Sequence, residues 1–333
     1  MQIGLRLPSA GRIQDVVATA RQAEAAGLDM VWLPDSPLNY REVWSVLGAI
    51  SVSTNRIGLG PMVTNFSSRH LTVTAAAAGT ISEAAPGRFA IGVGAGDSAV
   101  GFDTMRPATV AQMEDGVVKL RALMAGEPVA YGDFHAKLRD AHQSPPILIA
   151  ASGPRTQRMA GRVGDGAVLP MGRIEQKIEG VLAGAAEAGL PRPKMYAALT
   201  CAAGEEPDLV LRRAKLHCMR MAQLEGVGMF EQAGFKIEGE FLAHKMGAHG
   251  DIGHSANVAE TAKMAEGLIS DEIATWYVKE HIVTGSTDEV AARLRGLADL
   301  GLTGAYLSQQ EGSVLPNRLI EILSPVLKQL HAA

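Results

Sequence analysis

The stretch "RFAIGVGAGDSAV", residues 88–100, places a glycine-rich turn directly after a short apolar run. The run from Arg88 to Val93 is rich in residues that suit a buried strand, and a helical pattern follows from about Thr109 to Met124. We therefore expect a strand that ends at Val93, with the loop Gly94-Ala95-Gly96-Asp97 at its carboxyl end.

Local sequence alone leaves three interpretations of this loop open. A dinucleotide-binding turn requires G-x-G-x-x-G at the start of a helix, with an acidic residue about 20 positions further on. Here Gly92, Gly94 and Gly96 have a different register, and Glu114 and Asp115 lie inside the helical pattern. The two other interpretations are a glycine turn without a ligand and a loop that binds another kind of cofactor. Residues elsewhere in the chain are needed to distinguish them.

The composition is typical of a folded protein with a large core. The 333 residues are 47% hydrophobic and 20% charged, and the formal net charge is -4, whereas nucleic-acid-binding domains usually carry a basic face. No apolar stretch is long enough to span a bilayer, and the first residues do not resemble a signal peptide. We expect a cytoplasmic protein that binds a small molecule but neither nucleic acid nor membrane, with Cys201 and Cys218 reduced.

Short apolar runs alternate with longer amphipathic ones, which predicts repeated βα units and a parallel sheet. Two helical patterns end at a glycine, the first at Gly27 and the second at Gly301. Eight strands alternating with helices favour an α/β fold of the (β/α)8 TIM-barrel type over an open doubly wound sheet. The expected strands are 2–7, 30–34, 57–63, 88–93, 147–151, 167–170, 195–201 and 305–308.

One segment, from about residue 225 to 283, interrupts this alternation. We interpret it as an insertion before the last βα unit of a single domain that spans residues 1–333, and we expect it to cover part of one end of the barrel, because long loops often act as lids. His244, His249 and His254 recur in it at a spacing that places them on no single helix face. We therefore expect no metal site.

The active site of a TIM barrel lies at the carboxyl ends of its strands. The residues expected there are mostly glycine or small and polar, which suits a flat, uncharged ring held by backbone groups. The segment Ser152-Gly153-Pro154-Arg155-Thr156 opens a helix after a strand, so its free amides and Arg155 can bind a phosphate. An ordinary helix start with Pro154 in the first turn explains the same segment.

With these motifs the sequence resembles the luciferase-like flavin and deazaflavin superfamily, whose members share a (β/α)8 barrel. Within it the chain is most similar to the coenzyme F420-dependent branch, especially methylenetetrahydromethanopterin reductase, in a "GPMVTN" strand end followed by a "GVGAGD" loop. The resemblance covers most of the chain apart from residues 98–146 and 204–283. It is carried by "DSPLNYREVW" (35–44), "RIGLGPMVTNFSSRH" (56–70), "GRFAIGVGAGD" (87–97), "ILIAASGPRTQRMAGRVGDGAVL" (147–169) and "TGSTDEVAARLRGLADLGLTGAYLS" (284–308).

The resemblance implies an oxidoreductase that transfers a hydride between coenzyme F420 and a small organic substrate. An FMN-dependent monooxygenase and a non-catalytic cofactor-binding paralogue are the alternatives. Asp97 is the first candidate for catalytic proton transfer, although it can instead cap the loop backbone; Asp35 is the second, mainly as a cofactor-orienting group. The residues expected around the ring and its phosphate are Asp35, Met62, Val63, Thr64, Asn65, Ala95, Gly96, Ser152, Gly153, Arg155 and Thr156.

Three further expectations concern the substrate, one peptide bond and the assembly. Sugar-phosphate dehydrogenases of the same branch have histidine and glutamate where this chain has Ser36 and Asp97, which argues against a sugar-phosphate substrate. Residues 40–44 follow the second strand and can contact substrate or form the buried stripe of a helix. Related barrels imply a non-prolyl cis bond between Met62 and Val63 or one bond earlier, and a homodimer is the expected assembly.

Overall fold

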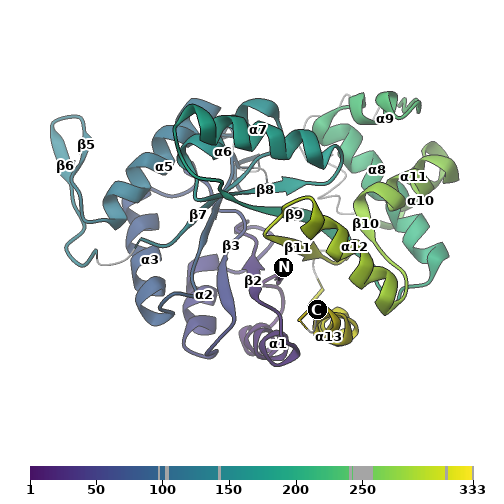
Figure 1. Ribbon diagram of the computed structural model, residues 1–333, viewed down its shortest axis with the longest axis horizontal. Coiled ribbons are helices and arrows are strands. Elements are labelled where there is room, and N and C mark those ends of the chain that lie inside the picture. Colours follow the sequence, from purple (N-terminus) through teal and green to yellow (C-terminus); the bar gives the residue numbers. More distant parts are fainter. Residues whose placement is uncertain are drawn as a thin grey trace.

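The computed structural model describes residues 1–96, 98–101, 105–141, 144–239, 242, 258–311 and 314–331. Its centre is a barrel of parallel strands surrounded by helices (Figure 1). The eight expected strands are all confirmed: β1 (Gln2–Arg6), β2 (Met30–Leu33), β3 (Gly58–Pro61), β4 (Ile91–Val93), β7 (Ile147–Ala150), β8 (Gly166–Pro170), β9 (Lys194–Cys201) and β11 (Gly304–Ser308).

The strands form a closed (β/α)8 barrel. Their order is β3-β2-β1-β11-β9-β8-β7-β4, and every neighbouring pair is parallel. Parallel bridges from Leu59 to Phe89 and from Thr64 to Val93 join β3 to β4 and close the ring. The carboxyl ends of all eight strands therefore meet at one end of the barrel, where a TIM barrel carries its active site.

A ring of helices covers the outside of the barrel (Figure 1). The predicted glycine stops are confirmed, since Gly27 ends the first helix with φ 92 and Gly301 lies just beyond another with φ 79. The ring comprises α1 (Ile13–Ala26), α2 (Val43–Ser51), α3 (Leu71–Ala84), α5 (Val110–Met124), α6 (Pro154–Val163), α7 (Ile174–Glu187), α12 (Thr287–Asp299) and α13 (Asn317–His331); the short α4 (Ser98–Gly101) follows β4.

The barrel interior is filled by side chains. In β1, Ile3 and Leu5 pack in the large core shared with the outer helices, so Gly4 and Arg6 face the interior. A Cβ on Gly4 would lie 2.5 Å from Nε1 of Trp32, so glycine is needed there for the indole to fit. The interior cluster consists of Trp32, Met62, Ala90, Leu148, Val168 and Tyr196.

The segment between β9 and residue 282 contains helices that pack together. They are α8 (Pro207–Glu225), α9 (Gly228–Gln232), α10 (Val258–Leu268) and α11 (Asp271–His281), and they share a second apolar core. Because α8 contributes Val210, Ala214 and Cys218 to that core, the helix before the expected insertion packs with the helices inside it. The bounds of the insertion stay a prediction. These helices lie beside α12 (Figure 1), and the short strand β10 (Ile282–Val283) joins them to β9.

Contact between the insertion and the carboxyl end of the barrel is made by α8. Gln310, which follows β11, donates from Nε2 to the carbonyl of Val210 over 3.3 Å. Arg213 forms ion pairs with Glu205 and Glu311, which follow β9 and β11. The single-domain boundary stays a prediction.

Two local features complete the fold. The hairpin of β5 (Val129–Tyr131) and β6 (Phe134–Ala136) projects from one side of the molecule (Figure 1) and was not expected from the sequence. Cys201 and Cys218 are buried free thiols, and burial raises the pKa of Cys201 to about 12. Among the described helices, none has the length and apolar character needed to cross a bilayer.

Candidate active site

Asp35 is a buried carboxylate directly after β2, and two side chains hold it. Only 1% of its side chain is exposed. Thr64 donates from Oγ1 to Asp35 Oδ2 over 2.8 Å, and Arg69 donates from Nη1 to the same oxygen over 2.5 Å. Because an ion pair and a hydrogen bond hold the carboxylate in place, Asp35 is suited to orient a donor group on a ligand.

Arg69 links Asp35 to the start of α2. Its Nη2 donates to Glu42 Oε1 over 3.0 Å, and Glu42 caps α2 by accepting from the backbone amides of Trp44 and Ser45. Burial acts to raise the pKa of Glu42, but the hydrogen bonds from Ser45 and Trp44 and the charge of Arg69 lower it below its ordinary value. The loops after β2 and β3 are therefore tied together by charge.

The segment after β3 forms the floor of the site. The Met62–Val63 peptide bond is cis, which confirms the expectation. The amide of Thr64 donates to the carbonyl of Gly92, and the amide of Gly94 donates to the carbonyl of Thr64. A Cβ on Gly94 would lie 2.7 Å from Val63 Cγ2, so glycine allows the loop after β4 to approach the floor.

The glycine loop after β4 is partly exposed beside this floor. Ala95 and Gly96 are both half-buried, and Gly96 has a φ of +97, which favours glycine. The predicted catalytic residue Asp97 lies outside the described residues. Asn65 is buried, and its Oδ1 accepts from the amides of Ser67 and Ser68, so that oxygen shapes the next loop.

The amino end of α6 is open in the way that an anion site requires. Its first flanking residue is Gly153, which offers no side-chain cap, and Pro154 is at the start of the helix. Thr156 Oγ1 donates to the carbonyl of Gly153 over 2.9 Å, which stabilises the turn. Because Ser152 and Arg155 are exposed beside the uncapped amides, a phosphate can satisfy those amides.

A second cationic group lies at the end of β1. Arg6 donates from Nη2 to the hydroxyl of Tyr40 over 2.9 Å, and Tyr306 of β11 is also a hydrogen-bond partner. Burial acts to lower the pKa of Arg6, but the two phenols raise it above its ordinary value. Burial also raises the pKa of Tyr306 to about 12, so this phenol is neutral at physiological pH.

Sequence reasoning missed Arg69 and Arg6. Arg69 falls inside the quoted "NFSSRH" stretch, but nothing local indicates that it pairs with a carboxylate 34 positions away. Arg6 is visible as a cation in the apolar run "IGLRL". Of residues 40–44, Tyr40 and Glu42 hydrogen-bond to these arginines. Trp44 is buried in the stripe of α2, and Arg41 donates to the carbonyl of Gly11.

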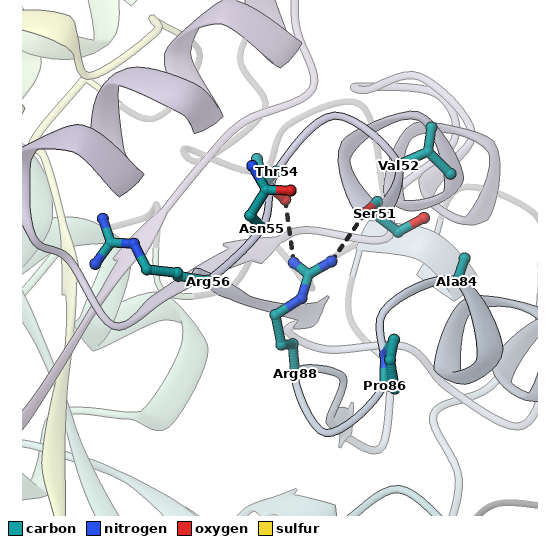
Figure 2. A pocket seen from close by; sticks show the side chains of 8 residues that line it. All are labelled: Ser51, Val52, Thr54, Asn55, Arg56, Ala84, Pro86 and Arg88. Atoms are coloured by element: carbon teal, nitrogen blue, oxygen red, sulfur yellow. Dashed lines mark hydrogen bonds between the residues drawn. The ribbon is translucent and has the colours of Figure 1, made fainter.

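A hollow of about 540 Å³ lies at the opposite end of the barrel, and Figure 2 shows the residues that line it. It is formed by the segment before β3 and the segment before β4, which are at the amino ends of those strands. Arg88 donates to Thr54 Oγ1 over 3.1 Å and to the carbonyl of Ser51 over 2.9 Å. Its guanidinium therefore braces a loop, and the hollow is separate from the candidate site.

In the part of the chain that the structure describes, no group of three His, Cys, Asp or Glu side chains is placed to hold a metal ion. His244, His249 and His254 lie outside the described residues.

Two curated relatives are enzymes that differ in substrate. The chain is 28% identical over 321 residues to 5,10-methylenetetrahydromethanopterin reductase of Methanolobus tindarius, covering 91% of this chain and 92% of that protein. It is 34% identical over 181 residues to the F420-dependent glucose-6-phosphate dehydrogenase of Beutenbergia cavernae, covering 48% and 53%. The homologues are thus oxidoreductases that include enzymes named for coenzyme F420.

Solved structures with the same fold include both deazaflavin and FMN proteins. The coenzyme F420-dependent tetrahydromethanopterin reductase of Methanopyrus kandleri superposes with a TM-score of 0.75 at 20% identity, covering 97% of each chain. The oxygenating constituent of 3,6-diketocamphane monooxygenase from Pseudomonas putida, in complex with FMN, has a TM-score of 0.68 at 17% identity, covering 99% of this chain and 97% of that one. These structures establish the shared barrel. Residues 1–304 match the luciferase-like monooxygenase family, and the chain therefore belongs to that family.

Proposed function

We propose that this protein is a coenzyme F420-dependent oxidoreductase that transfers a hydride between the deazaflavin and a small organic substrate. The observation that carries the proposal is the uncapped start of α6 at the same barrel end as the Asp35–Thr64 floor. These two features match a cofactor with a flat ring and a phosphate. The similarity to relatives that are named as F420-dependent, one of them aligned over 85% of this chain, supports the choice of cofactor.

The residues present fit that cofactor. The floor at Met62, Val63 and Thr64 and the loop at Ala95 and Gly96 bring backbone and small side chains together, as a planar ring requires. Ser152, Gly153, Arg155 and Thr156 would hold the phosphate, and Asn65 would support the floor through its loop. Coenzyme F420, when bound, supplies a ring carbon that gives or accepts a hydride.

The side chains then have separate tasks. Asp35, fixed by Thr64 and Arg69, accepts a hydrogen bond and orients the bound ring. Asp97 is proposed to move the proton that accompanies hydride transfer, since it adjoins the glycine loop in sequence. The residues of the floor would cover one face of the ring and exclude water from it, which suits hydride chemistry.

Turnover with reduced or oxidised coenzyme F420 tests the proposed activity. Enones and imines would be offered with the reduced cofactor and secondary alcohols with the oxidised one, and the change in cofactor absorbance would be recorded. Substrate-dependent oxidation or reduction of F420 is the expected result. If the protein consumes oxygen with reduced FMN and catalyses none of these reactions with F420, the monooxygenase is favoured. If it binds a cofactor but shows neither F420 turnover nor oxygen consumption, a non-catalytic protein is favoured.

Asp97→Asn tests the proton-transfer role. If Asp97 moves the proton, this variant binds coenzyme F420 within a few-fold of the wild type and turns over about 10²-fold more slowly. Asp35→Asn is the matched control, with weaker cofactor binding as its main effect. Unchanged turnover of Asp97→Asn at saturating cofactor and substrate would rule out the role, and a loss of affinity alone would assign Asp97 to the shape of the loop.

We also propose that the protein forms a homodimer and acts in the cytoplasm. Cyclic dimers are the commonest soluble assemblies, and the described part of the chain has no membrane-spanning helix. Sedimentation at micromolar concentration should give twice the mass of the 333-residue chain. A monomer under these conditions would contradict the dimer.

A further inference from the structure

Arg6 occupies an unusual place for a cation, because it ends a strand of the barrel directly after three buried apolar residues, Ile3 to Leu5. Ile3 and Leu5 belong to the outer core, and Arg6 alternates with them and pairs in register with Trp32 of β2. Trp32 is one of the interior side chains. The guanidinium therefore lies at the carboxyl end of the barrel, on the side of the candidate site.

Two phenols from different elements fix the direction of Arg6. Tyr40, in the loop after β2, accepts from Nη2 over 2.9 Å, and its ring centroid lies 5.4 Å from the guanidinium carbon. Tyr306 approaches from β11, the strand on the other side of β1. A long and flexible side chain is thus held between its two neighbouring strands, which reduces the entropy that ligand binding would otherwise cost.

Arg6 is also close to the proposed ring site. Adjacent strands of a sheet lie about 4.8 Å apart, so the end of β1 is about 10 Å from the end of β3, where Val63 and Thr64 form the floor. The turn that carries Tyr40 begins directly after Asp35. A substrate stacked on a ring above the floor would therefore reach the guanidinium of Arg6 with one of its own groups. That group would be only a few bonds away from the reacting carbon of the substrate.

We propose that Arg6 determines specificity by binding a carboxylate of the substrate, and that Tyr40 is its positioning residue. The substrate class is then a small carboxylic acid whose reducible or oxidisable carbon lies near the carboxylate. This inference rests on the proposed function for the identity of the ring. It adds a recognition group that the cofactor chemistry does not require.

The chemistry of arginine explains the choice of a carboxylate. A guanidinium is a planar fork of N–H donors that matches the two oxygens of a carboxylate, and it stays charged at every physiological pH. Charge-assisted hydrogen bonds of this kind are stronger than neutral ones, and more so away from bulk water. A neutral amide of the same shape would receive weaker hydrogen bonds from the same donors.

Binding of crotonate and crotonamide provides the test, since the two probes differ only in the charged group. Each is titrated by calorimetry into protein loaded with oxidised coenzyme F420. Hydrogen bonds to charged groups contribute about 1.5–3 kcal/mol, so the wild type should bind crotonate about 10- to 100-fold more tightly. Equal binding of the two probes by the wild type would overturn the proposal, whatever the variants do.

Three variants localise the effect. Arg6→Gln should bind crotonate and crotonamide equally. Arg6→Lys should keep part of the preference for crotonate, because it keeps the charge without the planar fork of donors. Tyr40→Phe should reduce the preference less than Arg6→Gln does. Arg295→Gln, on the exposed face of α12, is the control and should behave as the wild type. A preference that persists in folded Arg6→Gln, as judged by circular dichroism, would contradict the assignment.

Cofactor affinity separates this inference from the proposed function. Arg6→Gln should bind coenzyme F420 as tightly as the wild type, because Arg6 is assigned to the substrate. If Arg6→Gln instead loses F420 affinity while the probe preference is unchanged, Arg6 belongs to the cofactor site and the inference fails. If the wild type does not bind F420, the proposed function fails, and the same pair of probes tests Arg6 in the protein without cofactor.

Discussion

Replacing Arg69 by methionine tests whether the Asp35 carboxylate depends on its partner. Methionine keeps the length of the apolar stem and removes the charge, leaving Asp35 with Thr64 as its remaining described donor. The Asp35 side chain is 1% exposed and that of Arg69 is 16% exposed, so water cannot readily replace the guanidinium. Removing one partner of such a buried pair costs about 3–5 kcal/mol, and we expect Arg69→Met to lower the free energy of unfolding by that amount.

Urea unfolding followed by tryptophan fluorescence measures the loss. Arg162→Met is the matched control, because Arg162 pairs with Glu114 over 3.0 Å but both side chains are about one-third exposed; this pair should contribute about 0–1 kcal/mol. The double variant Asp35→Asn with Arg69→Met should be more stable than Arg69→Met alone, since it no longer buries an unpaired charge. The reasoning is refuted if Arg69→Met loses no more stability than Arg162→Met, or if the second substitution restores nothing.

Two other predictions concern packing and pH. Gly184 of α7 lies so close to α6 that an added Cβ would collide with the backbone carbonyl of Arg158, so Gly184→Ala should destabilise the protein by about 1–3 kcal/mol. A Cβ added at Gly296, in α12, would have no other heavy atom within 4 Å, so Gly296→Ala should instead stabilise the protein by about 0.5–1 kcal/mol in the same urea assay. Equal changes in stability for the two variants would contradict the packing argument. Burial, with Lys177 and Arg293 nearby, lowers the pKa of His281 to about 4. On acidification the unfolded chain therefore takes up the proton first, and the free energy of unfolding should fall between about pH 6.5 and 4. His281→Phe should reduce the slope of this free energy against pH by up to about 1.4 kcal/mol per pH unit. An unchanged slope would show that His281 does not contribute.

The barrel strands could be predicted because they are buried on both faces. Such strands are near-continuous apolar runs, and all eight were visible between amphipathic helices. The hairpin was missed because each of its strands has three residues, although Gly132-Asp133 between Tyr131 and Phe134 is the two-residue turn that favours a hairpin. The packing of α8 on α10 and α11 could not be predicted, because its apolar face has the same sequence pattern whether it packs on the barrel or on other helices.

The site was predictable only where chain neighbours act together. The glycine loop and the start of α6 are local motifs, and the order of strands brings them to one end of the barrel. The ion pair between Asp35 and Arg69 and the contact of Arg6 with Tyr40 and Tyr306 join residues distant in sequence. Such pairings depend on side-chain directions that the barrel imposes, and no pattern in the chain encodes them locally.

The identity of the ring is the central claim, and a side-by-side titration of the purified apoprotein with coenzyme F420 and with FMN tests it most directly. The account predicts saturable binding of F420 that is at least tenfold tighter than that of FMN, a difference of about 1.4 kcal/mol. Arg155→Gln should weaken F420 binding if the start of α6 holds the phosphate. Tighter binding of FMN than of F420 would contradict the account and favour an oxygen-using flavin enzyme on the same barrel.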